Sequence, residues 1–372
     1  MTAATATKSF KLMTKGLPFS EATTGLKPNV SAALRKLGVS TVTVALGLLE
    51  SDPKLFAELV GQTGPDFYAF QSAIATAAGG DALQAGEKKE LLDLPCSMGF
   101  DIEKLSTLET TFGDTEEILL TLEGFQAPAL DLPGIDLSDE LPPIRDQGLR
   151  GTCVAHAMVR CYEHIEFKTA GSPKPNILDY SEQFTYWYTK QKDGQLNVEG
   201  TWIQYAADEV VNLGTSTEGI CPYQPGRYPA TDASQRGPQP SQAAYNEART
   251  HRANTARRVN PKDVDALMTV LTSGKAIAYA IPVFRSWHFS PETRASGYLT
   301  MPLGMNDAIV GGHAITLTGW GRDTDVPGGG YFIFDNSWST AWGKYNQFGP
   351  GRGILPFKYA QLFGKEAFFL TL

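Results

Sequence analysis

The chain has 372 residues, of which 42% are hydrophobic and 19% are charged, and its formal net charge is -8. This balance excludes a disordered chain and is typical of a soluble globular protein that buries a core. Because the chain is longer than the size at which one hydrophobic core usually stops growing, we expect two structural units.

The charge is unevenly distributed along the chain. Residues 1–50 contain six Lys/Arg and two Asp/Glu, whereas residues 51–126 contain four and fourteen. Phosphate backbones would be repelled by the second stretch, so we expect no nucleic-acid partner.

Cysteine usage and the N-terminus bear on the cellular compartment. Four cysteines, Cys96, Cys153, Cys161 and Cys221, are too few for a disulfide framework in a chain of this length and suit a reducing compartment. The first residues lack the apolar run of a signal peptide, and the longest apolar run, Val39–Leu49, is too short to cross a bilayer but suits a buried helix. We expect a cytoplasmic protein without a membrane span, although secretion without a cleavable signal stays open.

The N-terminal third of the chain is predicted to be a flexible tail, residues 1–20, followed by an all-helical domain, residues 21–126. Several segments in it open with Ser, Asp or Asn and continue with apolar residues at helical spacing. The helical segments are residues 29–37, 51–60, 64–78, 86–94, 101–112 and 114–125.

Residues 26–49 resemble the helix-hairpin-helix-like domain at the end of the bacterial RNA polymerase alpha subunit, in which two short helices flank a turn. The segment lacks the paired glycines of DNA-binding hairpins. Protein contact or simple packing is therefore its expected role.

Residues 126–143 contain four prolines and no helical period, which predicts an extended linker. A second domain, residues 127–372, begins there. It should have helices first, near residues 153–170 and 201–214, and strands second, at residues 275–284, 313–321, 331–338 and 367–372. This order predicts an α+β domain with two lobes and a cleft between them.

Cys153 is the candidate nucleophile. It follows a Gly-Thr loop and opens a stretch free of Gly and Pro, so it should lie at a helix N-terminus, where the helix dipole and free N–H groups stabilise a thiolate. Its own backbone N–H could then face a developing oxyanion. Gln147, on the same loop, is the candidate for the second oxyanion donor.

His313 and Asn336 are the candidate proton partner and its orienter. His313 begins a predicted strand, and Asn336 ends the strand that returns beside it, so the amide carbonyl could fix the tautomer of the imidazole. Trp338 would cover that hydrogen bond and keep water away.

These segments together resemble the papain family of cysteine peptidases. QGLRGTCVAHA is similar to the family's cysteine motif, GGHAITLTGWG to its histidine motif and DNSWSTAWG to its asparagine motif. They occur in the family's order, with 160 residues from Cys153 to His313 and 23 more to Asn336. The resemblance covers roughly residues 130–372 and implies a papain-like two-lobed catalytic domain that hydrolyses peptide bonds through a Cys153 thioester.

The sequence also departs from the family pattern. Val154 and His156 stand where the family usually has Trp and Phe, Gly312 replaces the common Asp or Asn before the histidine, and the usual disulfide cysteines are missing. The packing beneath the nucleophile should therefore differ, but none of these changes removes a catalytic group.

The resemblance further implies where a peptide substrate binds. Gly200 is the candidate for the glycine turn that holds the substrate backbone. Ala280 and Ala314 match positions that line an apolar pocket, and because both are small the pocket should accept a bulky apolar side chain.

Other histidines and cysteines have simpler interpretations. His156 and His164 are expected to pack or face solvent and not to catalyse. His156 lies close enough in sequence to perturb the thiolate. His288 is the single rival to His313 as the base. Cys96, Cys161 and Cys221 are expected to be small buried hydrophobes. No close pairing of His and Cys indicates a metal, and no cofactor is expected.

Three functions remain open from the sequence. The first is a peptidase, the second is another Cys-His acyl enzyme such as a transglutaminase or deamidase, and the third is an inactive peptide-binding module. The combination of Gln147 with Asn336 in an NSW motif favours the first. We also expect a zymogen in which residues 1–126 restrain the enzyme, with the proline-bearing linker or a neighbouring helix in or near the cleft; a pure docking role is the alternative.

Overall fold

A computed structural model of the protein describes residues 10–12, 24–62, 64–102, 132–170, 178–226 and 235–372. The helix predicted at residues 114–125 and the first part of the linker lie outside these residues. So does most of the helix predicted at residues 101–112, and its two described residues, Asp101 and Ile102, are not helical.

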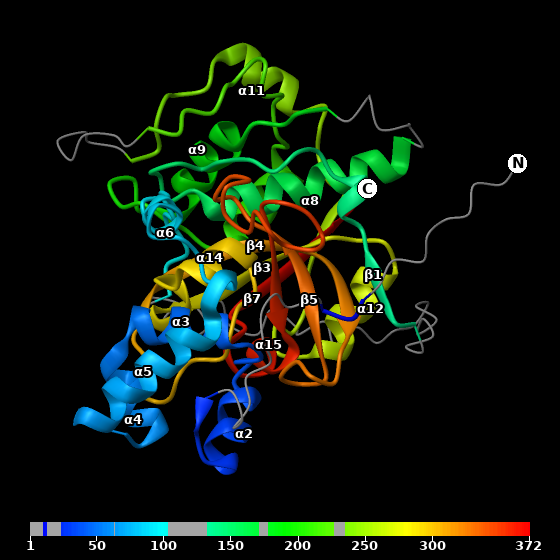
Figure 1. Ribbon diagram of the computed structural model, residues 1–372. Helices are drawn as coiled ribbons and strands as arrows, with labels where there is room; N and C mark the ends of the chain where they lie inside the picture. The colour runs from blue at the N-terminus through cyan, green and yellow to red at the C-terminus, as the bar shows by residue number, and fades with distance from the viewer. Residues whose placement is uncertain (1–9, 13–23, 63, 103–131, 171–177, 227–234) are drawn as a thin grey trace, which may run out of the picture.

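The N-terminal helical unit confirms the helices predicted before residue 95. Its helices are α2 (Pro28–Lys36), α3 (Val42–Ser51), α4 (Pro53–Val60), α5 (Gly64–Ala78) and α6 (Ala85–Leu92), with a 3₁₀ turn η1 (Gly79–Asp81). Thr41 and Asp52 cap α3 and α4 by accepting hydrogen bonds from backbone N–H groups. The unit has its own apolar core, and Figure 1 shows α2 to α5 in blue beside the sheet.

Residues 10–12 are not part of a free tail, which corrects the prediction for these three residues. The Phe10 ring lies 6.3 Å from that of Phe348, and the Phe10 carbonyl accepts a 2.6 Å hydrogen bond from the Tyr331 hydroxyl. Lys11 also forms an ion pair with Asp323 at 3.2 Å. The chain is thereby anchored on the C-terminal lobe.

The C-terminal lobe is built on an antiparallel sheet with the order β2-β7-β3-β4-β5-β6, and β1 pairs with β4 beside this path. The strands are β1 (Gly134–Asp136), β2 (Thr255–Arg258), β3 (Ile277–Phe284), β4 (Ile309–Arg322), β5 (Gly330–Asp335), β6 (Arg352–Pro356) and β7 (Glu366–Thr371). The predicted linker is therefore partly a strand, because Gly134–Asp136 pairs with Gly319–Gly321 of β4.

Helices cover this sheet and form the second lobe (Figure 1). The helical lobe contains α8 (Cys153–Ala170), α9 (Glu182–Asp193), α10 (Ile203–Asn212) and α11 (Gln242–Ala248). The sheet lobe carries the 3₁₀ turn η2 (Ser138–Glu140) and α12 (Val264–Thr272), α13 (Arg285–His288), α14 (Pro291–Ser296) and α15 (Phe357–Phe363). This arrangement confirms the predicted α+β class with helices first and strands second.

The two lobes meet where α8 packs on β3 and β4. The apolar cluster at this junction contains Cys153, Ala157, Ala280 and Ala314, all of them buried. Small residues on both strands let the helix approach the sheet closely. The N-terminus of α8 thereby comes next to the middle of the sheet.

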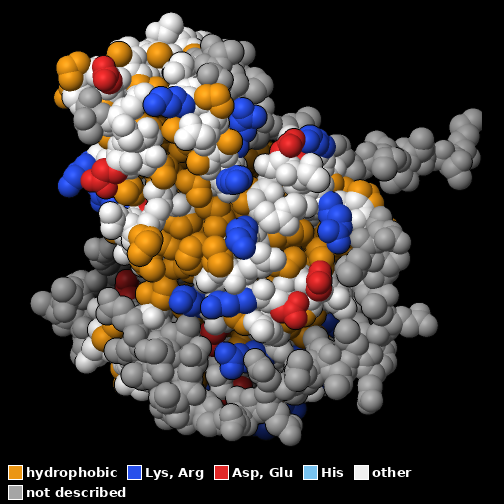
Figure 2. Space-filling view, turned by 90° about the horizontal axis from the view of Figure 1, so that it is seen from below, with side chains coloured by type: hydrophobic (Ala, Val, Ile, Leu, Met, Phe, Trp, Pro, Cys, Tyr) orange, Lys and Arg blue, Asp and Glu red, His pale blue; other side chains and the backbone are white. Residues whose placement is uncertain are grey.

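The surface seen from below carries an area of apolar side chains with Lys and Arg side chains over and beside it (Figure 2). Among the described residues, no helix is both long enough and apolar enough to span a bilayer.

Candidate active site

Cys153 is the first residue of α8, as its sequence context predicts, and its side chain is fully buried. Its sulfur accepts a hydrogen bond from the backbone N–H of Ala314 on β4 at 3.3 Å. The thiol therefore lies between the helix N-terminus and the strand that also carries His313.

Burial raises the pKa of the Cys153 thiol to about 11, although backbone N–H groups of Ala314, Gly99, Val154 and Cys153 itself act in the opposite direction. Desolvation disfavours the charged thiolate, whereas N–H donors stabilise it. Because desolvation dominates, the thiol is neutral at physiological pH in this structure.

His313 and Asn336 form the predicted pair. Nε2 of His313 lies 2.8 Å from Oδ1 of Asn336, and the same Oδ1 accepts a hydrogen bond from the Ser337 N–H. Oδ1 is an acceptor, so Nε2 carries the proton and Nδ1 carries the lone pair. Nδ1 is buried and has no hydrogen-bond partner among the described residues. Burial also lowers the pKa of His313 to about 4.

Trp338 covers this pair, as the sequence predicts. Its ring stacks on the His313 ring with 4.2 Å between centroids and an interplanar angle of 23°. The indole is almost fully buried and donates a hydrogen bond from Nε1 to the Ser97 carbonyl at 2.8 Å. The imidazole is therefore held on one face by an aromatic ring and on one edge by an amide.

Gln147 lies on the loop before Cys153 with its side chain fully buried. Ser337 donates to its Oε1 at 2.5 Å, so Nε2 is the donor end. That Nε2 contacts two carbonyl oxygens, Ser97 at 3.1 Å and Arg150 at 2.7 Å. The amide is thus oriented, and one of its donors is already occupied by a residue from the N-terminal part of the chain.

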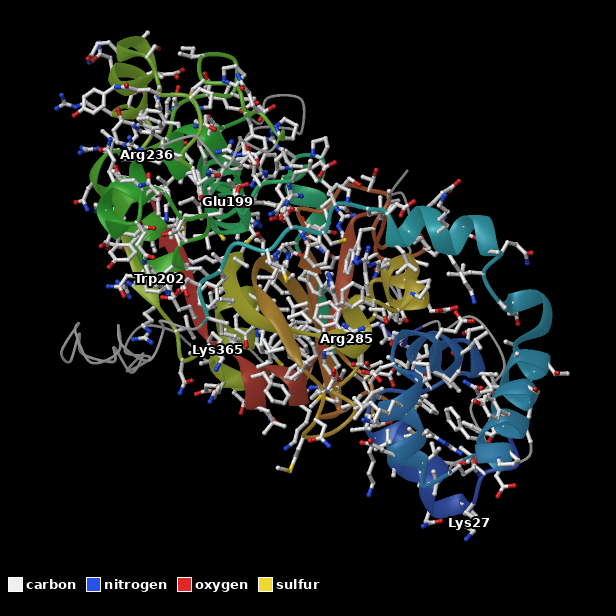
Figure 3. The ribbon with its side chains drawn as sticks, turned by 90° about the vertical axis from the view of Figure 1, so that its left-hand side faces the viewer. Lys27, Glu199, Trp202, Arg236, Arg285 and Lys365 are labelled. Carbon is white, nitrogen blue, oxygen red and sulfur yellow. The ribbon has the colours of Figure 1, made fainter. Side chains whose placement is uncertain are left out.

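The chain after α6 crosses this site. Gly99 O accepts a 2.8 Å hydrogen bond from Thr201 N–H, and Asp101 N–H donates to Thr201 O at 3.4 Å. On the other side, Phe100 N–H donates to Gly312 O at 3.1 Å. Residues 97–101, here called the cleft segment, are therefore bonded to both walls. Figure 3 shows this chain, in cyan, passing beside Glu199 and reaching Trp202.

Contacts of the cleft segment are too close to admit a side chain at Gly99. A Cβ placed there would lie 1.9 Å from the Gly151 carbonyl oxygen, and a Cβ on Gly312 would lie 2.4 Å from the Phe100 carbonyl oxygen. Glycine is therefore required where the two backbones meet.

Phe100 belongs to the same buried apolar cluster as Ala280 and Ala314, the residues of the predicted apolar pocket. The two alanines are directly opposite each other in the β3–β4 register, and both are buried in one cluster with Phe100 and Cys153. Phe100 is 4% exposed.

Gly200 forms the predicted turn, but its neighbour makes the backbone contacts. Gly200 has φ +90°, which favours glycine, and its own N–H and carbonyl are bonded inside the helical lobe. The N–H and carbonyl of Thr201 face the cleft segment instead. Reasoning from the sequence selected Gly200 and missed Thr201, because glycine is the residue type that marks a turn in a sequence.

His156 and His288 lie near the site without joining the pair. His156 contacts Thr152 O through Nδ1 at 3.1 Å and meets the Tyr223 ring edge-on at 4.8 Å. His288 packs edge-on against Trp338, with 5.7 Å between centroids. Burial lowers the pKa of each to about 3, so both are neutral here.

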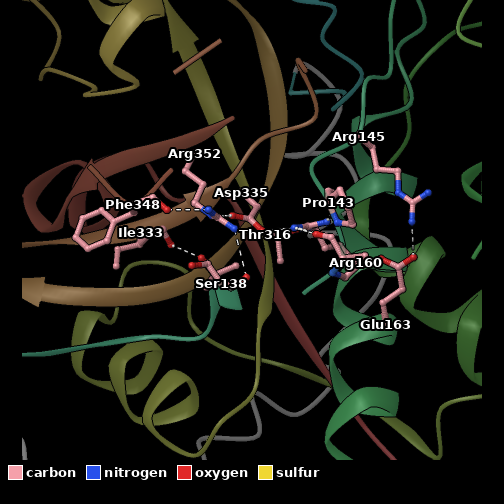
Figure 4. A network of polar contacts seen from close by, with 12 residues as sticks. Ser138, Pro143, Arg145, Arg160, Glu163, Thr316, Ile333, Asp335, Phe348 and Arg352 are labelled. Atoms are coloured by element: carbon pink, nitrogen blue, oxygen red, sulfur yellow. Dashed lines mark hydrogen bonds and ion pairs between the residues drawn. The ribbon is translucent and has the colours of Figure 1, made fainter. Parts of the chain in front are cut away.

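A buried ionic network lies behind Asn336 (Figure 4). Asp335 accepts hydrogen bonds from Nε of Arg160 on α8 at 2.7 Å and from Nε of Arg352 on β6 at 3.0 Å. Arg160 also donates to the carbonyls of Pro142 and Pro143. The residue before Asn336 is thereby tied to both lobes.

All four cysteines are free thiols. Burial raises the pKa of Cys96 to about 11. In the described part of the chain, no group of His, Cys, Asp and Glu could hold a metal ion.

A helix-borne cysteine, a strand-borne histidine and an asparagine that fixes its tautomer are the parts of a thiol acyl-transfer site. A family model described as papain family cysteine protease matches residues 134–352, which is more than half of the chain. The chain therefore belongs to the papain family.

Curated relatives agree with this assignment. Cathepsin B-like CP2 of Giardia intestinalis is 27% identical over 218 residues, which cover 58% of this chain and 65% of the relative. Cathepsin B-like CP3 of the same organism is 27% identical over 239 residues, covering 61% and 70%. The match thus spans slightly less than two thirds of CP2.

Solved structures with the same fold include xylellain, a cysteine protease from Xylella fastidiosa, with TM-score 0.53, 23% identity and coverage of 64% of this chain and 86% of that one. The proform of Amb a 11, a ragweed pollen allergen, has TM-score 0.53 at 15% identity and covers 87% and 97%. The likeness in fold to this proform extends over more of the chain than the likeness to xylellain.

Proposed function

We propose that the chain is a cysteine endopeptidase whose active site is blocked in this structure by its own cleft segment. The substrate would be a protein or peptide, bound in extended form along the cleft. The observation that carries both parts is the set of backbone hydrogen bonds between residues 99–101 and the residues Thr201 and Gly312, together with the Gly99 N–H that acts on the Cys153 sulfur.

The first chemical step uses the Cys153 thiol and the His313 lone pair. Nδ1 of His313 takes the thiol proton, and the sulfur attacks the carbonyl carbon of the scissile bond. The bond between Nε2 and Asn336 keeps this tautomer and direction, and Trp338 excludes water from it.

Charge that develops on the carbonyl oxygen needs preorganised donors. Nε2 of Gln147 and the backbone N–H of Cys153 are the candidates. In the closed form the Ser97 carbonyl uses the first of these donors, at 3.1 Å. Release of the cleft segment would return it to a substrate.

The remaining steps complete hydrolysis. Protonated His313 gives its proton to the leaving amine, which breaks the peptide bond and leaves a Cys153 thioester. Water then attacks the thioester with His313 as base, and the acid product leaves with regeneration of the thiol.

Two features indicate that the cleft segment makes an inhibitory contact and is not bound as a substrate would be. The Gly99 N–H is among the donors that act on the Cys153 sulfur, so the segment offers the nucleophile a hydrogen where catalysis needs a carbonyl carbon. Both reacting groups are also buried in this structure, which raises the pKa of Cys153 and lowers that of His313. Neither group carries its catalytic charge while the segment is in place.

The blocking segment proposed here precedes the predicted linker, of which residues 126–131 lie outside the described residues. Pro133 and Gly134 of the linker lie at β1, near the C-terminal end of β4, and not in the cleft. The occupant comes from the end of the N-terminal helical unit. Arg294 holds the chain that leads into the cleft segment, because it donates hydrogen bonds to the carbonyls of Leu91 and Leu92 at the end of α6.

A comparison of full-length variants tests the proposal. Wild type, Gly99→Ala and Gly99→Ala/Cys153→Ala would be assayed on an internally quenched peptide library. We expect low turnover for wild type, higher turnover for Gly99→Ala and none for the double variant. Cleavage by the double variant would refute Cys153 as nucleophile.

The other functions predict different products. An acyl enzyme acting on glutamine side chains would release ammonia without new N-termini, and an inactive module would bind peptides without either product. Mass spectrometry of the library products separates these outcomes.

A further inference from the structure

One buried ion pair in the helical lobe contacts the wall of the cleft and has no part in the chemistry described above. Lys190 and Asp193, near the end of α9, are both fully buried, and Nζ of Lys190 lies 2.7 Å from Oδ2 of Asp193. Nζ also donates to the Gly200 carbonyl at 2.7 Å.

The Gly200 carbonyl and the Thr201 N–H belong to the same peptide unit. A trans peptide is planar, and its C=O and N–H point in opposite directions. The structure has no cis peptide bonds among the described residues. Lys190 therefore holds one end of the peptide whose other end donates to Gly99 O at 2.8 Å.

We propose that Lys190, fixed by Asp193, is a positioning residue for peptide binding: it orients and polarises the Gly200–Thr201 peptide so that the Thr201 N–H becomes a strong donor to the backbone of a bound chain. This inference rests on the proposed peptidase function for its kinetic part. Its structural part concerns the contact with the cleft segment that is already present.

Two physical effects act together in this arrangement. A buried ammonium with a single rigid position removes the rotational freedom of the turn, which Gly200 with φ +90° would otherwise have. A positive charge on the carbonyl also draws electron density through the amide, and hydrogen bonds in such chains strengthen one another in a low-dielectric interior.

Asp193 supplies what a buried cation requires. A charge taken out of water is costly unless it is paired and hydrogen-bonded. Asp193 pairs with Lys190 through Oδ2 and accepts the Gln195 N–H through Oδ1 at 2.8 Å. The pair is thereby built into the start of the loop that leads to Gly200.

Tyr186 provides a matched comparison on the same helix. It lies one turn before Lys190 and its hydroxyl accepts a hydrogen bond from the Gly200 N–H at 3.0 Å. That N–H belongs to the preceding peptide unit. Tyr186→Phe therefore loosens the same glycine without removing the charge from the Thr201 peptide.

The test uses full-length protein. Lys190→Met/Asp193→Asn removes both charges, so no unpaired charge stays buried, and Asn keeps an acceptor for Gln195. We expect the Thr201 amide to exchange its hydrogen about tenfold faster than in wild type, and Tyr186→Phe to have a smaller effect. Unchanged exchange at Thr201 would overturn the proposal, as would equal effects of the two changes. Unchanged exchange in β4 serves as the control for folding.

A kinetic measurement in the Gly99→Ala background gives the second readout. It compares substrates that have two residues before the scissile bond with esters of a single acylated residue, which lack the backbone that Thr201 would contact. The ratio of kcat/KM for long over short substrates should fall about tenfold, mainly through KM. A general structural defect would lower both and leave the ratio unchanged. If no variant cleaves any peptide, the proposed function fails, and the exchange result still decides the role of Lys190.

Discussion

Gly99 of the cleft segment and Gly151 of the cysteine loop meet backbone to backbone, so closely that a Cβ on Gly99 would lie 1.9 Å from the Gly151 carbonyl oxygen. Such a separation cannot exist between real atoms, so any larger residue at position 99 must move one of the two chains. Gly151 precedes the nucleophile by two residues and is buried. Gly99 is buried as well, so a larger residue there strains the contact that holds the cleft segment beside the cysteine loop.

The first prediction concerns this contact. Gly99→Ala should open the cleft segment and speed alkylation of Cys153 by iodoacetamide roughly 10- to 100-fold, because overpacking of this kind costs about 1–3 kcal/mol. The rate is measured by mass spectrometry of the labelled peptide. Gly86→Ala in α6 is the control, since its Cβ would meet nothing within 4 Å. Equal rates in the two variants would contradict an obstructing role for residue 99.

The second prediction concerns the pocket. Phe100→Ala removes a 4% exposed ring from the cluster that contains Ala280 and Ala314. Truncation of a buried Phe costs about 3–5 kcal/mol, so the closed form should weaken by at least about 100-fold. Competition between the cleft segment and an added peptide inhibitor for the active site measures this change in the stability of the closed form. Tyr68→Ala, at an exposed aromatic on α5, should leave the competition as in wild type; if it matched Phe100→Ala, the pocket would not be the cause.

The third prediction ranks the catalytic residues in the Gly99→Ala background. Cys153→Ala and His313→Ala should abolish turnover, while Gln147→Ala should lower kcat about 10²- to 10³-fold, as loss of one oxyanion donor does. Asn336→Ala should be milder, because it removes the orienter but leaves the proton chemistry. Circular dichroism checks folding in each. The assignment of Asn336 fails if its loss equals that of His313 in a folded protein.

The fourth prediction follows from the pKa of Cys153, which burial raises to about 11. The thiolate should be nearly absent at neutral pH in wild type and should appear only as the pH approaches that value. The difference in thiolate absorbance between wild type and Cys153→Ala isolates this one group. In Gly99→Ala the transition should move to lower pH, because water regains access to the sulfur. A wild-type transition below neutral pH would mean that the thiol is already ionised in the closed form.

The fifth prediction concerns Glu292 on α14, a buried carboxylate at the junction with the N-terminal unit. Neither of its oxygens has a hydrogen-bond partner among the described residues, Lys88 Nζ lies 3.9 Å away, and burial raises its pKa to about 7. The folded protein therefore keeps this carboxyl group protonated at pH values at which the unfolded chain has lost the proton. The stability that the bound proton contributes falls as the pH rises towards about 7.

Glu292→Gln stays neutral and should raise the free energy of unfolding by about 1–3 kcal/mol near pH 8, with little effect near pH 5. Thermal melts at both pH values measure this difference. Glu90→Gln, at an exposed position of α6, is the control. A loss of stability near pH 8 would show that the ion pair with Lys88 outweighs the cost of burying the charge.

The sequence allowed much of the fold and the arrangement of the candidate site to be predicted, for reasons that are local. Cys153 follows a loop and opens a long uninterrupted helical pattern, so its place at a helix start needs no tertiary knowledge. His313 lies on β4 and Asn336 directly follows β5, and these two strands, joined by a glycine-rich turn, pair as predicted. Short-range pattern is sufficient in such cases.

Other features depend on where distant segments meet. Nothing in the residues around Gly99 indicates that they cross a cleft formed 50 to 210 residues later, and the helical pattern predicted from Asp101 onwards favours a different structure. Lys190 looks like an ordinary exposed lysine at the end of a helix. Its burial arises because the loop from Gly194 to Gly200 folds back over it, and no local propensity encodes that return.

Asp335 connects the two lobes that form the cleft. It joins Arg160 of the helical lobe to Arg352 of the sheet lobe, and its side chain is buried. Moving the lobes apart would break the contact between Asp335 and Arg160, whose hydrogen bonds offset the cost of burying the two charges. The buried contact therefore holds the two lobes in one relative position, and under the proposed function a substrate would enter by displacing the cleft segment, without a movement of the lobes.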